Sequence, residues 1–296
     1  MPARIATRPG GANGWPTDWS TDDHDAALTA YLLSAGPTSP RPDGASARRF
    51  FEDAFDWSEV AAAHYTGYFE PVVPAATARS AAFPVPLHGS PPGGIAASRA
   101  EIEDGDLLRG HEIAWLRDAV DRFMLQVQGS GRLALADGGT MRVGYAGRNG
   151  RPYISIGRHL IATGAIPAAE MTADVLAAWL RADAARGAAT MRLNESYVLF
   201  RRLDAAVGEG PPGTMGCPVT AGRTLAVDPG HVPLGSPVWI EVASPDPIAR
   251  LCVAQDTGSA IKGAGRADLF FGSGRAAGQA AGALNHGGRM VVLTPR

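Results

Sequence analysis

The sequence is poor in cysteine and lysine. Its 296 residues include two cysteines, Cys217 and Cys252, too few for a disulfide scaffold and too few alone for a structural zinc site. They form either one bridge in an oxidising compartment or two buried thiols. Of the 27 basic residues only Lys262 is a lysine. A compact ammonium group is not interchangeable with a guanidinium group, so Lys262 is a candidate for a specific role.

An excess of one charge and a long apolar run are also missing. The 27 basic residues face 29 acidic ones, and no basic stripe is present, which argues against binding to nucleic-acid backbones. No run of eighteen apolar residues occurs, which argues against an integral membrane protein. The first residues lack the parts of a secretory signal, so we expect that an export segment was either removed or never present.

Glycine and proline are abundant, with 37 and 23 residues, well above the usual combined share of about 12%. Frequent turns favour short strands, and we expect a mainly β fold with few peripheral helices. After a loose segment through Pro16, helices are predicted over residues 20–36, 46–55 and 101–121, with another opening at Thr172. Strands are predicted over residues 65–71, 83–87, 123–127, 132–135, 141–145, 153–156, 224–227, 238–242, 251–255, 268–271 and 290–293.

The C-terminal strands are expected to form a compact all-β unit, and three aspartates lie among them. Asp228, Asp256 and Asp268 each lie at the end or start of an apolar run, so strand ends are expected to bring them to one rim. The loop between Asp256 and Asp268 is rich in glycine and contains Lys262, and glycine lets backbone approach a ligand closely. The alternative is that the aspartates only cap turns, as aspartate often does.

Several separated segments carry a family resemblance. They are YTGYFEP, VQGSGRL, YAGRNGRPYISIG, NESYVLF, TAGRTLAVDPGHVPLGSPVWIE and QDTGSAIKGAGRADLFFG, in this order from Tyr65 to the C-terminal region. In these segments the chain resembles the membrane-bound lytic murein transglycosylase A family, whose C-terminal part is the three-aspartate domain.

The resemblance implies a double-psi β-barrel domain over residues 1–90 and 208–296, with a second β-barrel domain inserted over residues 91–207 and a groove between the two. Pro/Gly-rich stretches over 84–94 and 208–216 fit such crossings. It also implies a periplasmic, outer-membrane-associated enzyme that acts on peptidoglycan glycan strands, with other cell-wall enzymes as further candidate partners.

The implied reaction cleaves the β-1,4 bond between N-acetylmuramic acid and N-acetylglucosamine and leaves a 1,6-anhydro end. By resemblance Asp268 is the general acid/base, Asp256 the supporting acid and Asp228 the third aspartate. One carboxyl suffices because the nucleophile is the C6 hydroxyl of the substrate itself. Asp268 must then keep its proton near neutral pH, so Lys262 is expected on the substrate or on Asp256.

Further residues are candidates for contacts with the glycan, with turn formation or core packing as the alternative for each. These are Gln128, Ser130 and Gly131, then Tyr65, Tyr68 and Glu70, and finally Asn194, Ser196 and Tyr197. The seven histidines show no metal-ligand spacing, so we expect neither a metal nor another cofactor, and His231 is expected to be structural.

Two other functions fit the same residues. A non-catalytic peptidoglycan-binding or wall-loosening protein would use the aspartates only for turns and ligand hydrogen bonds, because fold alone does not fix function. A hydrolytic muramidase would use Asp256 to activate water. The products released from isolated cell walls separate these hypotheses.

Overall fold

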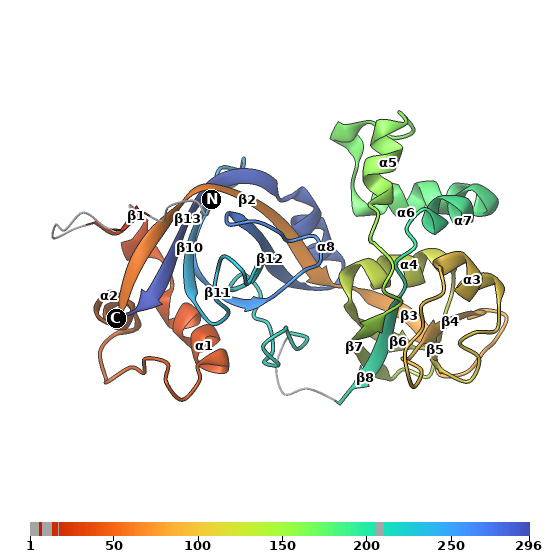
Figure 1. Ribbon diagram of the computed structural model, residues 1–296, viewed down its shortest axis with the longest axis horizontal. Helices are drawn as coiled ribbons and strands as arrows, with labels where there is room; N and C mark the ends of the chain where they lie inside the picture. The colour runs from red at the N-terminus through yellow and green to blue at the C-terminus, as the bar shows by residue number, and fades with distance from the viewer. Residues whose placement is uncertain (1–5, 8–13, 17, 205–209) are drawn as a thin grey trace. The chain divides into compact units, whose positions relative to one another are not determined.

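The computed structural model describes residues 6–7, 14–16, 18–204 and 210–296. The chain divides into two compact units (Figure 1). Unit 1 comprises Met1–Phe69, Gly208–Gly272 and Ala280–Arg296, and unit 2 comprises Glu70–Val207 and Ser273–Gln279. Most of the predicted loose N-terminal segment and the first residues of the predicted crossing at 208–216 lie outside the described residues.

Unit 1 is built on a sheet that closes on itself. Its strands are β1 (Ala6–Thr7), β2 (Phe55–Glu70), β9 (Thr224–Val227), β10 (Pro237–Val242), β11 (Ile248–Asp256), β12 (Arg266–Ser273) and β13 (Asn285–Pro295). Within the described residues the order is β1-β2-β12-β9-β11-β10-β13, and β13 also pairs with β2. The neighbours β9 and β11 are parallel, and the β2–β13 pairing removes the open edges that a flat sheet would expose.

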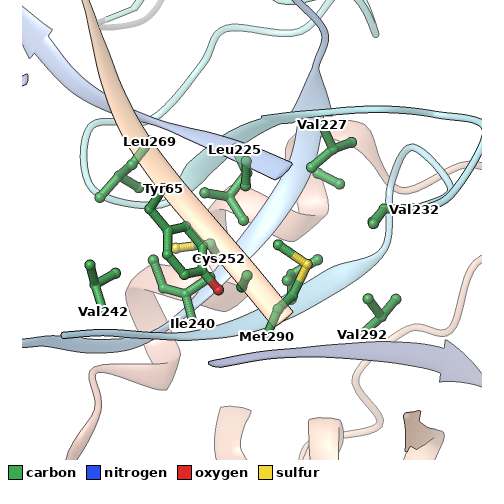
Figure 2. Close-up of a cluster of buried hydrophobic side chains, with 14 of the residues drawn as sticks. Tyr65, Leu225, Val227, Val232, Ile240, Val242, Cys252, Leu269, Met290 and Val292 are labelled. Atoms are coloured by element: carbon green, nitrogen blue, oxygen red, sulfur yellow. The ribbon is translucent and has the colours of Figure 1, made fainter. Parts of the chain in front are cut away.

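Apolar side chains fill the inside of this barrel. Figure 2 shows part of the cluster, in which Tyr65, Leu225, Cys252 and Leu269 are fully or almost fully buried. All four residues of β9 are buried, as expected for a central strand covered on both faces. Cys217 and Cys252 are both buried free thiols, which decides between the two states predicted for them.

The helices η1 (Trp19–Thr21), α1 (His24–Ser34) and α2 (Ala47–Ala54) cover the barrel of unit 1 with a second, aromatic-rich core. The helix α8 (Gly274–Ala283) lies outside this core and is shared with unit 2. Asp23 caps α1 by accepting a hydrogen bond from the Ala26 N–H. The Asp22 carboxylate is paired with Arg223 at 2.8 Å and accepts the Leu251 N–H, which fixes this segment to β11.

Unit 2 contains a six-stranded sheet in the order β4-β5-β3-β6-β7-β8. Its strands are β3 (Val72–Ala76), β4 (Val85–His88), β5 (Glu112–Leu116), β6 (Ser130–Leu135), β7 (Thr140–Arg148) and β8 (Val198–Leu203). Its helices are α3 (Arg99–Asp104), α4 (Ala119–Gln128), α5 (Ile156–Ala162), η2 (Ala168–Glu170), α6 (Ala173–Ala182) and α7 (Ala184–Arg192). The helix α4 contacts β4, β5, β6 and β8 and buries Phe123 and Leu125.

A buried arginine joins the segments of unit 2. Arg99 is 1% exposed and donates hydrogen bonds to the carbonyls of Asn194 and Ser196 and to the Gln126 side chain. It also pairs with Glu103. Because Arg99 begins α3 while the carbonyls precede β8, one side chain ties together segments that lie about a hundred residues apart.

Much of the predicted secondary structure is confirmed. The helices α1, α2 and α6 lie where caps and apolar stripes predicted them, and Thr172 caps α6 by accepting the Val175 N–H. All five C-terminal strands are present as β9 to β13. The coarse expectation of a mainly β protein with few helices is also confirmed.

Several other predictions are wrong. Residues 123–127, predicted as a strand, belong to α4, because Asp118 caps the helix at one end and Gly129 ends it with φ 78° at the other. The predicted helix over 101–121 contains α3 but also the strand β5. Ser155 caps α5, so residues 153–156 are not a strand. The C-terminal part is not purely β, since it includes α8.

The first crossing between the units lies earlier than the expected boundary after residue 90. The chain leaves unit 1 between Phe69 and Glu70, because β3 pairs with β5 and β6, and β4 with β5, inside the sheet of unit 2. Among the described residues, no helix combines the length and apolar character that a bilayer crossing requires.

Candidate active site

Asp268 lies on the face of β12 that is turned away from the barrel core. Its neighbours Ala267 and Leu269 belong to the core, and successive residues of a strand point to opposite faces. Thr66 and Tyr68 share the outer face of β2 by the same alternation, since Tyr65 is in the core. The Thr66 hydroxyl donates a 2.6 Å hydrogen bond to Asp268 Oδ1, and the rings of Tyr68 and Phe270 lie 5.1 Å apart.

Asp256 ends β11 and is held by four donors. The register of β11 against β9 shifts between Ala254 and Asp256, and such a bulge re-aims the side chain that follows it. Asp256 Oδ1 accepts hydrogen bonds from the N–H and hydroxyl of Thr214 and from the Thr257 N–H, at 2.8–2.9 Å. The Tyr68 hydroxyl donates to Oδ2 at 3.0 Å. These four hydrogen bonds fix the orientation of the carboxylate, which accepts in each of them.

Asp228 joins two loops. Its carboxylate accepts the Gly230 N–H at 3.2 Å and the Gly263 N–H at 2.9 Å, and these bonds lower its pKa. Lys262, next to Gly263, is exposed and close enough to contribute to the same lowering. Within the described part of the chain, the lysine therefore lies near Asp228 and forms no hydrogen bond or ion pair with Asp256 or Asp268.

The pKa of Asp268 is raised to about 6. The largest cause is burial, which disfavours the ionised carboxyl. The Thr66 hydrogen bond and the charge of Arg266 act in the opposite direction, and the negative charge of Asp256 raises the pKa further. The site thus combines a carboxyl that keeps its proton up to about pH 6 with the hydrogen-bonded carboxylate of Asp256, and such a difference between two carboxyls separates acid from charge-stabilising roles.

Gly67 lets α8 approach the strand that carries Thr66 and Tyr68. A Cβ at Gly67 would lie 2.6 Å from Ala281 Cα and 2.8 Å from a Phe271 ring carbon. We expect Gly67→Ala to lower the free energy of unfolding by about 1–3 kcal/mol, because an overpacked contact forces backbone shifts. Thermal denaturation measures the loss. Gly282→Ala on α8 is the matched control, since nothing lies within 4 Å of its added methyl, and equal losses in both variants would contradict the prediction.

Tyr65 and Glu70, predicted to contact the glycan, are buried. Tyr65 packs in the barrel core, and its hydroxyl donates to the Arg289 carbonyl at 2.7 Å. Glu70 is 0% exposed and pairs with Arg132 and Arg142, while Ser273 donates to it at 2.6 Å. Tyr65 therefore has the core-packing role given above as its alternative. Glu70 instead belongs to a buried group of ion pairs.

The other predicted contact residues lie in unit 2. Asn194 and Ser196 are buried, and the Asn194 side chain accepts the N–H groups of Ile154 and Ser196. Tyr197 is also buried, and its hydroxyl is hydrogen-bonded to His88. Gly131 is required by packing, since a Cβ there would lie 2.3 Å from a Leu125 methyl carbon. Gln128 and Ser130 are partly exposed at the α4–β6 junction.

Sequence reasoning missed the residues that hold the aspartates. Thr66 and Thr214 make these contacts, and Arg266 donates to Thr66. Only Thr66 carried a signal, because it shares a strand face with Tyr68 at spacing two. His231 is exposed. Across the described residues, no group of three His, Cys, Asp or Glu side chains is placed to hold a metal ion.

Comparison with known protein families gives two matches. The MltA specific insert domain matches residues 64–201, and the 3D domain matches residues 223–294. The class is therefore that of a 3D-domain protein that carries the MltA-specific insert. Membrane-bound lytic murein transglycosylase A of Escherichia coli K12 is 33% identical over 90% of this chain and 74% of its own length. The chain belongs to the membrane-bound lytic murein transglycosylase A family of enzymes, and the resemblance seen in the motifs is confirmed.

Solved structures agree with this assignment. The chain is similar over its whole length to E. coli MltA with bound chitohexaose, at 28% identity and a TM-score of 0.82, covering 95% of that chain. It is also similar to the lytic transglycosylase LtgG of Burkholderia pseudomallei, at 35% identity and a TM-score of 0.69, covering 98% of that chain. MltA from Neisseria gonorrhoeae has a TM-score of 0.81 at 28% identity, with 100% of this chain and 97% of that chain covered.

Proposed function

We propose that this protein cleaves the β-1,4 bond between N-acetylmuramic acid and N-acetylglucosamine in peptidoglycan and leaves a 1,6-anhydro end. The names of its relatives support a transglycosylase acting on murein, and the relative with bound chitohexaose supports a glycan strand as the ligand. The observation that carries the proposal is the Asp268 carboxyl, whose pKa is raised to about 6 beside the fixed carboxylate of Asp256.

The proposed mechanism uses one carboxyl twice. Asp268 first donates its proton to the glycosidic oxygen as the bond to C1 breaks, and it then accepts the proton of the C6 hydroxyl as that oxygen bonds to C1. A well-oriented intramolecular hydroxyl has an effective molarity of about 10⁵ M or more, so no activated water is needed. Asp256, held by the Thr214 and Tyr68 donors, stabilises the positive charge of the oxocarbenium-like transition state.

The pH dependence follows from the protonation of Asp268. The carboxyl must carry its proton when the glycan binds, and its pKa is raised to about 6. We therefore expect kcat/KM to be level below pH 6 and to fall about tenfold per pH unit well above it. Initial rates on solubilised glycan between pH 4.5 and 8.5 measure this profile. A profile that rises through pH 6 would instead indicate a carboxylate base and contradict the assignment.

Digestion of isolated cell-wall sacculi tests the reaction itself. Mass spectrometry of the released fragments should find 1,6-anhydro-muropeptides, which are lighter by one water than hydrolysis products. Reducing ends would support the hydrolytic muramidase in which Asp256 activates water, and intact glycan would support the non-catalytic binding protein. Either of these results would overturn the proposal.

The type of β-barrel in unit 1 and the cellular location of the protein are also part of this proposal. The closed sheet of unit 1, with its parallel β9–β11 pair, supports a double-psi β-barrel. The membrane-bound relatives support a periplasmic place of action at the outer membrane, with other cell-wall enzymes as candidate partners. Cell fractionation with an antibody against this chain tests the location.

A further inference from the structure

Three side chains form a hydrogen-bonded relay that ends on Asp268. Arg266 Nη2 donates to Thr66 Oγ1 at 2.8 Å, and Thr66 Oγ1 donates to Asp268 Oδ1 at 2.6 Å. The guanidinium is itself fixed, because its other terminal nitrogen donates to the carbonyls of Ala267 and His64. The relay therefore rests on backbone groups of both β12 and β2.

The direction of each hydrogen bond follows from proton counting. A guanidinium has only donors, and a threonine hydroxyl has one proton. Because Thr66 Oγ1 accepts from Arg266, its own proton points to Asp268 Oδ1. Asp268 Oδ1 is therefore the acceptor of this hydrogen bond. In a protonated carboxylic acid the carbonyl oxygen is a better acceptor than the hydroxyl oxygen. The exchangeable proton of Asp268 is consequently favoured on Oδ2.

We propose that Thr66, oriented by Arg266, is a positioning residue that holds the acid/base proton of Asp268 on Oδ2 and fixes the direction in which this oxygen faces the substrate. The inference rests on the proposed function, since it assigns the oxygen that exchanges the proton with the glycan. Without the hydroxyl, the carboxyl is free to rotate and to carry its proton on either oxygen. A small misplacement of a reacting group can cost about 100-fold in rate.

The same hydrogen bond tunes how readily Asp268 gives up its proton. Arg266 and Thr66 favour the carboxylate, while burial and the charge of Asp256 favour the protonated acid. Tyr68 is a further titratable group at the site, and its pKa is raised well above the usual value by burial and by both aspartates, so it stays uncharged. Loss of the Thr66 hydroxyl therefore shifts the pKa of Asp268 upward.

Thr66→Val tests the inference, because it removes the hydroxyl but keeps the branched shape. We expect kcat to fall about 10- to 100-fold with little change in KM, and the alkaline limb of the pH profile to move up by about half to one unit. Thr66→Ser keeps the hydroxyl and should restore both. Thr294→Val is the matched control, since Thr294 is exposed and pairs with Asp56 at the far end of the β2–β13 ladder from Thr66.

A purely structural role would lower activity without moving the alkaline limb, and that result would overturn the inference. Wild-type activity in Thr66→Val, or no rescue by Thr66→Ser, would overturn it as well. Thr66→Ala serves the same measurements if the valine variant does not fold.

A carbon-13 NMR titration of the aspartate carboxyls reads the pKa of Asp268 without any activity, with Asp268→Asn identifying its signal. An unchanged pKa in Thr66→Val contradicts the relay, whereas absence of anhydro products from the wild type contradicts the proposed function. The two failures are thus distinguishable.

Discussion

Asp268→Asn is expected to lower the release of anhydro-muropeptides by about 10²–10⁴-fold, the usual contribution of a general acid/base. The amide keeps the shape of the carboxyl but has no proton of suitable acidity to donate and cannot take one back. Glycan binding should be largely retained. Turnover on sacculi and binding to insoluble peptidoglycan measure the two effects. Asp246→Asn, on an exposed loop of the same unit, is the matched control and should be fully active.

More than a few per cent of wild-type activity in Asp268→Asn would refute the role of this residue. The same variant also reports on stability. Because the folded pKa of about 6 exceeds the unfolded value of about 3.9, the wild type loses stability as pH rises through 6, whereas the amide does not ionise. Between pH 4 and pH 8 the free energy of unfolding of the variant should therefore rise by on the order of 1–3 kcal/mol relative to that of the wild type. This range is an upper bound, because the Asp268 side chain is partly exposed.

Arg99→Ala is expected to destabilise unit 2 by about 3–5 kcal/mol, the usual cost of removing one member of a buried charged network. The carbonyls of Asn194 and Ser196 and the Gln126 side chain would lose their donor, and Glu103 would keep Arg122 and Arg192 as its basic partners. Hydrogen–deuterium exchange measures the opening of α4 and β8 directly.

Arg109→Ala is the control for this change. Arg109 pairs with Asp106, and both side chains are more than 70% exposed, so its removal should cost no more than about 1 kcal/mol. If Arg99→Ala accelerated amide exchange in unit 1 as much as in unit 2, the prediction that Arg99 stabilises unit 2 alone would be wrong.

The five C-terminal strands of unit 1 were predictable because their apolar runs are short and separated by turn residues, whereas the first ten residues of β2 (Phe55–Glu70) were not predicted as a strand. The helix α4 was not, since the run FMLQV over residues 123–127 suits a strand and a helix equally, and the decision falls to the Asp118 cap and to Gly129. The helix α8 has a glycine-rich sequence with low helix propensity. Its small residues permit the close approach of Ala281 to Gly67, a tertiary contact that no local pattern reveals.

The same limit applies to the site. Strand ends predicted that the aspartates lie near one another, and the influence of Asp256 on the pKa of Asp268 agrees with this placement. The donors that give Asp268 and Asp256 different roles come from distant parts of the chain. Thr66 lies about two hundred positions before Asp268, and Thr214 lies about forty positions before Asp256. Such partners depend on the register of strands, which composition and spacing do not determine.

The pairing of β2 with β13 has a consequence for the order of assembly during translation. All six strands of unit 2 are synthesised before the first strand of the 224–295 region, but the barrel cannot close until residues up to 295 are available. Asp268 therefore acquires the burial that raises its pKa as one of the last events in the maturation of the chain. A nascent or truncated molecule would present an ordinary ionised carboxylate, so the acid that the proposed reaction requires would form only once the fold is complete.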